Sequence, residues 1–526
     1  MQDAEVPVLI VGGGPVGLTA RALLDRWGVP CLLVERHHAL SPFPRSRLVN
    51  VRSMEIFRGL GLAARITDRA FAPRYGRVRF RDTLGGGDFA SAAMTGVRAP
   101  VPESPALGVV TSQDRLEPVL LAAAAAPVRF GVELVGLAEE SEGVVARLTD
   151  RRTGAESRLR ARYVLAADGA RSTVRDLLGV GTTGPGALGG VTTVVFDADL
   201  DRWCADGPAG VYFTAHGSFM PLYPEGGWAW FGPTPAVVDG TDWGDLVAHA
   251  LGPGVDVRPE VLRVQHWVMN AFVAERLRRG RVLLAGDAAH AVPIVGGLGM
   301  NAGVADAHNL CWKLAGVLRG WAGPGLLDTY ASERHPVAHE TLRQAVANAQ
   351  LLGDVQSRRR ERPPTGGAVP DRIELPWMDQ YFAQLGLVLG VAYRSSAVLT
   401  GDKGDTAPPS PPGTDYVPTV APGHRLPHRR LTGDRSTLDA LGEWFTLFTP
   451  DPAAWAPGTA AAGPLCVPVP LRVEPLPREH AEPYELGPHG ALLVRPDGHV
   501  AAHWPDRPQA PAALAEALGR LTAAPA

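Results

Sequence analysis

Three glycine-rich segments of the chain each follow a run of apolar residues, and the first lies near the N-terminus. Residues 7–11 (PVLIV) have the continuous apolar character of a buried parallel strand, and residues 15–27 have a helix-like pattern. At their junction stands a GxGxxG motif, whose glycines let the backbone turn tightly and approach a pyrophosphate at a helix N-terminus. We therefore predict that a dinucleotide phosphate binds at Gly12, Gly14, Pro15, Val16 and Gly17.

An acidic residue follows the glycine motif at the expected distance. Glu35 ends a second strand-like run, residues 30–34, and lies eighteen residues past Gly17. A carboxylate at this place can accept hydrogen bonds from an adenosine ribose, and we expect Arg36 beside it to contact the same nucleotide. By itself the glycine motif is also compatible with a tight turn, and it does not separate NAD from FAD.

Two later motifs favour FAD. Residues 168–172 (DGARS) and 286–290 (GDAAH) each follow an apolar run, and the second leads to a glycine-rich turn at residues 296–303. An acidic side chain at a strand end can bind the ribityl hydroxyls of a flavin, and a helix N-terminus can direct N–H groups at its ring. Each motif alone could be a strand-to-helix turn with a capping aspartate. Together they predict flavin contacts at Asp168, Asp287, Gly299, Met300 and Asn301. We expect His290 to pack near the cofactor and not to act as a base.

The order of these segments predicts an α/β fold with a Rossmann-like FAD-binding domain. Between its strands, residues 191–270 consist of short β-rich segments that are typical of an inserted antiparallel sheet. A stretch rich in Pro, Gly, Asp and Ser predicts an exposed linker further on. We assign a discontinuous FAD-binding domain (1–75, 107–190 and 271–400), a substrate-binding β-sheet domain (76–106 and 191–270), a linker (401–423) and a C-terminal domain (424–526).

Composition excludes several classes of protein. The 526 residues carry a net charge of −3, so the whole molecule is not attracted to nucleic acid or anionic lipid. No apolar run approaches the roughly 18 residues that a membrane span requires. The four cysteines lie far apart without a CxxC pair or a nearby histidine, which argues against a metal site or a disulfide framework and favours a reducing cytoplasm.

Several motifs together resemble a known family, the single-component (class A) FAD-dependent aromatic hydroxylases. The resemblance is strongest to the aromatic polyketide branch, which acts on tetracenomycins and anthracyclines, and it runs from about residue 5 to 400. The segments that carry it are GGGPVGL, PRSRLVNVRSMEIFRGLGL, SQDRLE, DGARSTVR, GDAAH, GMNAG and ERHPVA. Leu298 departs from the pattern, because many relatives have a polar residue at this place.

The resemblance implies an activity and further site residues. It implies that NADPH or NADH reduces a non-covalently bound FAD and that a flavin C4a-hydroperoxide hydroxylates an aromatic small molecule with O2. It also places Gln113 on the flavin chain, Arg45 near the pyrophosphate or a mobile flavin, and Pro293 beside the flavin edge. The chain's C-terminal part resembles the thioredoxin-like tail of that branch, without the CxxC of a redox protein.

The substrate and the catalytic groups are less defined. Aromatic and polar residues of the inserted sheet are our candidates for the substrate pocket: Tyr212, His216, Met220, Trp230 and Phe231. No side chain is assigned as an acid or a base, and the oligomeric state is a monomer or a homodimer. Three alternatives stay open: Baeyer–Villiger oxygen insertion on the same scaffold, a flavin dehydrogenase or oxidase that transfers no oxygen, and a flavin-bearing partner without turnover.

Overall fold

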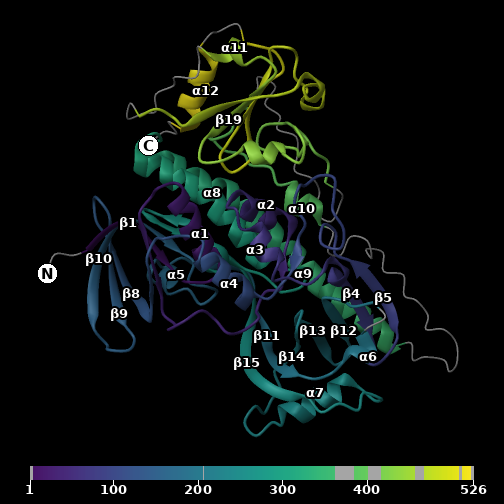
Figure 1. Cartoon of the computed structure of the whole chain (residues 1–526). Coiled ribbons are helices and arrows are strands. Elements are labelled where there is room, and N and C mark those ends of the chain that lie inside the picture. The colour runs from purple at the N-terminus through teal and green to yellow at the C-terminus, as the bar shows by residue number, and fades with distance from the viewer. Residues whose placement is uncertain are drawn as a thin grey trace.

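Two eight-stranded sheets, a four-stranded sheet and a two-stranded sheet organise the chain (Figure 1). The computed structural model describes residues 4–204, 207–361, 384–400, 416–456, 467–508 and 512–522. The first large sheet is that of the expected Rossmann-like domain, and the second is the expected insertion. The four-stranded sheet belongs to the C-terminal part, which lies at the top of Figure 1. The chain is therefore an α/β protein of the predicted class.

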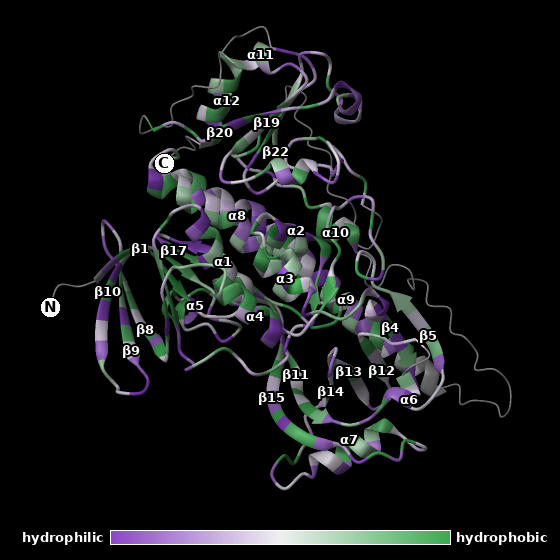
Figure 2. Ribbon diagram, viewed as in Figure 1, coloured by the Kyte–Doolittle hydropathy of each residue, from purple (hydrophilic) through white to green (hydrophobic). Residues whose placement is uncertain are grey.

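The first sheet is built around four parallel pairs of strands. Its order is β16-β17-β10-β1-β2-β7, with β8 and β9 attached to β10 as an antiparallel extension. The inner strands are apolar on both faces because helices cover them. In Figure 2 hydrophilic residues gather along β10 where it leaves the sheet with β8 and β9. The bounds are β1 Ala4–Val11, β2 Cys31–Glu35, β7 Val128–Phe130, β8 Val132–Glu139, β9 Val144–Asp150, β10 Glu156–Ala166, β16 Arg278–Arg279 and β17 Val282–Leu284.

The helices next to this sheet begin at the predicted motifs. Helix α1 starts at Pro15, within the first glycine motif, and packs against α8, which starts in the GMNAG segment. Helix α9 is long and continues to Glu361. The helices of this part are α1 Pro15–Arg26, α2 Val51–Gly59, α3 Ala63–Thr67, α4 Gln113–Leu121, α5 Thr173–Leu177, α8 Gly299–Arg319, α9 Asp328–Glu361 and α10 Leu385–Leu389. A two-stranded sheet pairs β3 Leu48–Val49, which precedes α2, with β6 Val109–Val110, which precedes α4.

The second large sheet is antiparallel except for one strand pair. Its order is β18-β15-β11-β14-β13-β12-β4-β5, and only β12 and β4 run parallel. Two of its strands, β11 and β15, are long, and helix α7 packs against β15. The bounds are β4 Arg77–Arg81, β5 Asp88–Ala93, β11 Thr182–Asp197, β12 Val211–Thr214, β13 Gly217–Tyr223, β14 Gly226–Pro233, β15 Glu260–Ala274 and β18 His290–Ala291, with α6 Asp201–Cys204 and α7 Trp243–Leu251 beside them.

The C-terminal sheet has the topology of a thioredoxin-like domain. Strand β19 lies between β20, which is parallel to it, and β21, which is antiparallel, and β22 follows at the edge. The bounds are β19 Phe445–Thr449, β20 Leu471–Pro475, β21 Ala491–Val494, β22 Val500–Trp504, α11 Pro452–Trp455 and α12 Ala513–Thr522. Cys466, the cysteine of this part of the chain, lies outside the described residues.

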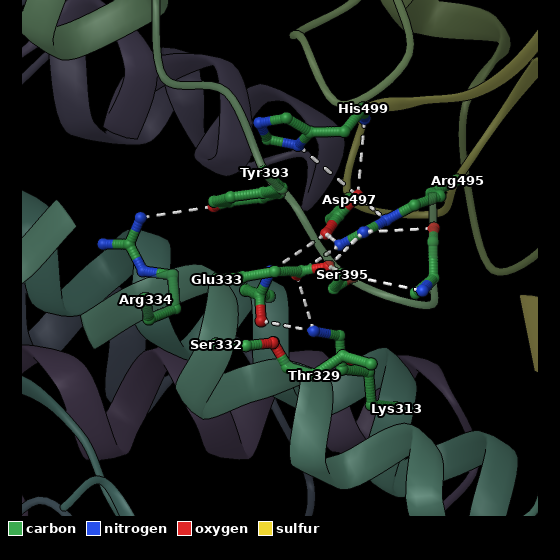
Figure 3. Close-up of polar contacts among 12 residues, drawn as sticks. Lys313, Thr329, Ser332, Glu333, Arg334, Tyr393, Ser395, Arg495, Asp497 and His499 are labelled. Carbon is green, nitrogen blue, oxygen red and sulfur yellow. Dashed lines mark hydrogen bonds and ion pairs between the residues drawn. The ribbon is translucent and has the colours of Figure 1, made fainter. Parts of the chain in front are cut away.

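Buried charges join the C-terminal domain to helices α8 and α9 (Figure 3). Glu333 of α9 accepts hydrogen bonds from Lys313 Nζ at 2.7 Å, from Ser395 Oγ at 2.6 Å and from both terminal nitrogens of Arg495. Arg495 in turn pairs with Asp497. These charged side chains are almost completely inaccessible to water. The two parts therefore share one buried interface.

The expected linker is exposed only in part among the residues that the structure describes, where Val417 is 70% exposed. Residues 401–415 lie outside them, but Tyr416 and Val420 in the remaining part are buried. Tyr416 packs in an apolar cluster with Val51 and Leu389, so the segment adheres to the FAD-binding domain. Among the described helices, none is long and apolar enough to cross a membrane.

Candidate active site

A cavity of about 1500 Å³ lies between the carboxyl ends of the parallel strands and the inserted sheet. Ligands of open α/β sheets bind at this end, where the loops after neighbouring strands meet. Pockets for one small molecule usually measure roughly 300–1,000 Å³. The cavity therefore has room for a dinucleotide and a second molecule. Thirteen of the predicted cofactor residues line it: Gly12, Gly14, Pro15, Val16, Glu35, Arg36, Arg45, Gln113, Asp168, Asp287, Pro293, Gly299 and Met300.

The first glycine motif forms a tight turn with an open front. Gly12 has a φ of 107°, and a Cβ on it would lie 2.3 Å from the carbonyl oxygen of Ala167. A Cβ on Gly17 would lie 2.0 Å from the carbonyl oxygen of Gly12, so Gly17 holds the turn against the helix and does not line the cavity. A Cβ on Gly14 would meet no atom within 4 Å. The turn thus leaves free space before the N-terminus of α1, as a pyrophosphate requires.

Glu35 closes the other side of this turn. Its Oε2 accepts a hydrogen bond from Gly13 N at 2.7 Å, and its Oε1 accepts one from His37 N at 2.8 Å. The carboxylate is therefore fixed at the end of β2, beside the glycine turn and at the cavity edge. Arg36 lines the same end of the cavity.

Asp168 and Asp287 end neighbouring strands but have different partners. Asp168 accepts hydrogen bonds from Ser172 Oγ at 2.6 Å and Val174 N at 3.0 Å. Asp287 receives none from the described residues and projects into the cavity, while the surrounding protein raises the pKa of its carboxyl by desolvation. The charges of His290 and Arg45 oppose that shift. Asp287 is therefore available to a ligand.

The turn before α8 directs a helix N-terminus at the cavity. Gly296 and Gly297 both have positive φ values, 101° and 64°, which L side chains rarely adopt. Leu298 precedes the helix without a side-chain cap, so the first N–H groups of α8, beginning at Gly299, lack a capping side chain. The partial positive charge of this N-terminus favours an electron-rich ligand group.

Two predicted residues position this turn and do not line the cavity. Asn301 donates to the carbonyl oxygens of Leu48 at 2.8 Å and Gly297 at 2.7 Å, and it accepts from Asn50 N at 3.0 Å. His290 Nε2 lies 2.6 Å from Oδ2 of the buried Asp306. Asn301 therefore acts through the backbone that it holds, whereas His290 packs against the buried carboxylate of Asp306.

Asp306 is the centre of the support below the GD motif. It accepts hydrogen bonds from Gly286 N at 3.1 Å and Arg334 Nε at 2.7 Å. Burial by itself raises the pKa of Asp306, but His290 and Arg334 outweigh it and hold the pKa at about 2. The ionised carboxylate thus fixes the loop that presents Asp287.

Gln113 and Glu117 form the floor of the cavity near Arg45. Gln113 donates to Glu117 Oε1 at 2.7 Å and accepts from Ser46 N at 3.4 Å. Burial raises the pKa of Glu117 to about 7, although Gln113 and the charge of Arg45 oppose the rise. Glu117 was not recognised in the sequence, since an acidic residue inside a helix gives no pattern of its own.

The predicted substrate residues divide between the two faces of the inserted sheet. Met220 and Phe231 line the cavity. Tyr212 and Trp230 do not: they pack in an apolar core on the opposite face, because neighbouring side chains of a strand point to opposite sides. His216 is exposed in the turn between β12 and β13, and its carbonyl oxygen accepts from Trp230 Nε1. These three assignments are corrected.

Residues that were not singled out form much of the remaining wall. They are Arg47, Phe213, Thr193, His266 and Trp267, all lining the cavity. Trp267 Nε1 donates to Thr193 Oγ1 at 3.0 Å, which fixes the indole on the sheet. The alternation along β12 contained the signal for Phe213, but choosing between Tyr212 and Phe213 requires knowing which face is covered.

Comparisons with known proteins agree with this geometry. Residues 5–345 match the family model of an FAD binding domain, and residues 419–525 match that of an aromatic-ring hydroxylase C-terminal domain. The chain is 36% identical to tetracenomycin B2 monooxygenase-dioxygenase of Streptomyces olivaceus, over 95% of each chain. It is also 36% identical to aklavinone 12-hydroxylase RdmE of Streptomyces purpurascens, over 95% of this chain and 96% of the relative.

Solved structures of flavin-dependent enzymes are also similar to this chain. The flavin-dependent monooxygenase PieE, in complex with FAD and substrate, superposes with a TM-score of 0.89 at 35% identity over the full length of both chains. A ternary complex of aklavinone-11 hydroxylase with FAD and aklavinone superposes with a TM-score of 0.83 at 35% identity, over 99% of this chain and 100% of the other.

Fold, cavity and motifs define a flavoprotein monooxygenase. The chain belongs to the FAD-dependent aromatic hydroxylases, in the branch that includes the tetracenomycin and aklavinone hydroxylases. It is an enzyme that uses FAD, with NAD(P)H as the reductant general to this family.

Proposed function

We propose that the enzyme hydroxylates a polycyclic aromatic compound of the polyketide type with O2. The observation that carries the proposal is the single continuous cavity, which runs from the glycine turn of α1 to the inner face of the inserted sheet. Its sheet side presents flat apolar groups, among them Phe213, Phe231 and Trp267. The names of the relatives, tetracenomycin and aklavinone hydroxylases, support a substrate of this size.

The residues present fit FAD along this cavity. The open turn at Gly14 would receive the pyrophosphate, Glu35 the adenosine ribose and Asp287 the ribityl hydroxyls. Arg45 and Gln113 lie beside that path, and the α8 N-terminus with Pro293 would meet the ring. When bound, FAD supplies the transfer of one oxygen atom to the aromatic ring.

The chain's own residues would bind and orient the substrate and keep water away from it. The inner face of the inserted sheet would hold the ring system flat against the cofactor, because Phe231 and Trp267 offer apolar surfaces for stacking. Enclosure between the two sheets excludes water from the reacting atoms. We assign no catalytic acid or base among the described residues.

The test is turnover with isotopically labelled O2. Purified holoenzyme is incubated with NADPH and a panel of polycyclic phenols, and accelerated NADPH oxidation is followed together with product mass. One labelled oxygen in a phenolic product supports the proposal. A lactone with labelled oxygen would instead show Baeyer–Villiger insertion, oxidation without label would show a dehydrogenase or oxidase, and no stimulation by any aromatic compound would contradict enzymatic turnover of this class.

Two further features belong to the proposal. The enzyme's dependence on NAD(P)H and its dispersed cysteines support a cytoplasmic location; three of these cysteines are free and buried. A monomer or a homodimer is proposed, and light scattering of the holoenzyme decides between them.

A further inference from the structure

Polar atoms without partners gather on one side of the cavity. All three guanidinium nitrogens of Arg47 are buried without a hydrogen-bond partner among the described residues, and so are Ser112 Oγ, Asp114 Oδ1 and Glu117 Oε2. Buried polar groups in native proteins are nearly always satisfied, so a cluster of unsatisfied ones needs an explanation. Arg47 directly precedes β3, and the other three residues belong to α4 and its N-cap; of the four, Arg47 and Glu117 line the cavity.

Arg47 is the member of this cluster whose burial without a partner is least favourable. Only 8% of the residue is exposed, and its nearest aromatic contact is the ring of Phe71 at 5.4 Å. Burial lowers the pKa of Arg47 to about 10 while Asp114 and Tyr223 oppose the shift, so the guanidinium is protonated at neutral pH. An unpaired buried charge is strongly unfavourable unless a partner compensates it.

The surroundings of Arg47 are those of the substrate end of the cavity. The wall next to it is apolar and includes Met94, Val110 and Phe213, which pack together in one cluster with Phe71. The residues expected to hold the pyrophosphate lie at the other end, around the α1 turn. A charge here therefore faces the second molecule that the cavity can hold.

The nearest acid is engaged through only one of its two oxygens. Asp114 Oδ2 accepts a hydrogen bond from the hydroxyl of Tyr223 at 2.5 Å, Oδ1 has no partner, and among the described residues no ion pair joins this carboxylate to Arg47. The nitrogens of Arg47 are buried although the residue lines the cavity, and its long side chain can turn toward a ligand through ordinary rotamers. A turn toward Asp114 is the competing arrangement.

We propose that Arg47 is a specificity-determining residue that binds an anionic oxygen of the aromatic substrate. The inference rests on the proposed function and narrows its substrate class to aromatic compounds with an ionisable hydroxyl, such as phenols and hydroxyquinones. A planar guanidinium pairs well with a delocalised oxyanion and with a neighbouring carbonyl oxygen. The same pairing lowers the pKa of a bound phenol and raises the fraction of the electron-rich phenolate.

The test compares two ligands of the same ring system that differ in charge at neutral pH. Oxidised holoenzyme is titrated, without reductant, with the hydroxynaphthoquinone lawsone, which is anionic at neutral pH, and with its neutral methyl ether. The variant is Arg47→Met, which keeps the length of the side chain and its contact with Phe71. We expect it to weaken lawsone binding by about 10- to 100-fold and to change binding of the ether by less than about twofold. Arg47→Lys should retain part of the preference.

Asp114→Asn is the matched control, because it removes the nearby acid and leaves Arg47 in place. It should keep or increase the preference for lawsone. Equal losses for both ligands in Arg47→Met, loss of FAD from that variant, or loss of the preference in Asp114→Asn would each overturn the proposal. The titration measures binding and needs no turnover. If the labelled-oxygen experiment fails while the preference for the anionic ligand holds, the proposed hydroxylation is rejected and the anion site at Arg47 is not.

Discussion

At the scale of single residues, the site separates side chains that hold the protein from side chains that face the ligand. Asp168 and Asp287 follow β10 and β17, which are neighbours in the same sheet. Asp168 is bound by Ser172 and Val174 and stabilises the start of α5. Asp287 has no such partner among the described residues and extends into the cavity. The same residue type therefore has two roles.

Replacing each aspartate should reveal this difference. Asp287→Ala removes an acceptor for the ribityl hydroxyls, so FAD affinity should fall by about 10- to 150-fold while the apoprotein keeps its melting temperature. Asp168→Ala is the comparison, and it should lower the melting temperature of the apoprotein because two donors lose their partner. Fluorescence titration of apoprotein with FAD, together with thermal unfolding, measures both. Full FAD affinity in Asp287→Ala would contradict the assignment.

Glu117 predicts a dependence of stability on pH. Its pKa in the folded chain is about 7, above the ordinary 4.5, so the folded state holds the proton more tightly than the unfolded state. Apoprotein stability should therefore fall as pH rises from about 4.5 to 7 and then level off. Glu117→Gln should remove this fall and raise the unfolding free energy at pH 8 by about 2–3 kcal/mol.

Urea unfolding of both apoproteins across this pH range measures the effect. The difference between variant and wild type should close as pH falls toward 4.5, since Glu117 is then protonated in both states. A constant difference at every pH would show that the substitution acts by packing and not through the carboxyl proton.

At the scale of elements, the positions of the turns could be predicted from the sequence, but which face of each strand lines the cavity could not. The first glycine motif marks the start of α1 at Pro15, as predicted, because only glycine fits next to Ala167. Along the inserted sheet, alternation says that Tyr212 and Phe213 face opposite sides but not which side is covered. That depends on the position of the FAD-binding domain, which residues distant in the chain determine.

The glycine turn itself can be tested with two substitutions of equal size. Gly17→Ala places a Cβ 2.0 Å from the carbonyl oxygen of Gly12, so it should distort the turn and lower the melting temperature of the apoprotein. Gly14→Ala meets nothing within 4 Å and should leave that temperature unchanged. Its methyl group instead occupies space before the helix, so FAD affinity should fall by roughly 10-fold or more.

The readouts are the melting temperature of each apoprotein and the dissociation constant for FAD. Gly14→Ala with wild-type affinity would show that the pyrophosphate does not approach this turn. Gly17→Ala with wild-type stability would show that the close contact to Gly12 can relax.

At the scale of the whole molecule, the C-terminal domain is part of the same structure as the FAD-binding domain. Apolar residues of both, including Trp312 and Phe445, form one core. A polar path also connects them: Asp306, below the GD motif, binds Arg334, and Arg334 donates to the hydroxyl of Tyr393 at 3.2 Å. Tyr393 stacks on His499 of the C-terminal domain. The sequence indicated the domain but not this interface, since its partners are up to 445 residues apart.

Of the ion pairs that cross this interface, two lie in different surroundings and allow a controlled test of what holds the domain in place. Arg495 pairs with Glu333 at 2.6 Å, and both side chains are 0% exposed. Arg26 pairs with Glu443 at 2.9 Å, but these side chains are 43% and 26% exposed. Arg495→Met leaves Glu333 and Asp497 with less compensation in a dry interior, so the free energy of unfolding should fall by about 3–5 kcal/mol. Arg26→Met should lower it by at most about 1 kcal/mol, and this smaller effect should shrink further at high salt.

Urea unfolding of the holoenzyme at two salt concentrations measures the free energy of unfolding of both variants. Equal, small losses of unfolding free energy in the two variants would show that apolar packing alone fixes the C-terminal domain. The structure instead predicts that the buried charges make the two domains unfold as one unit.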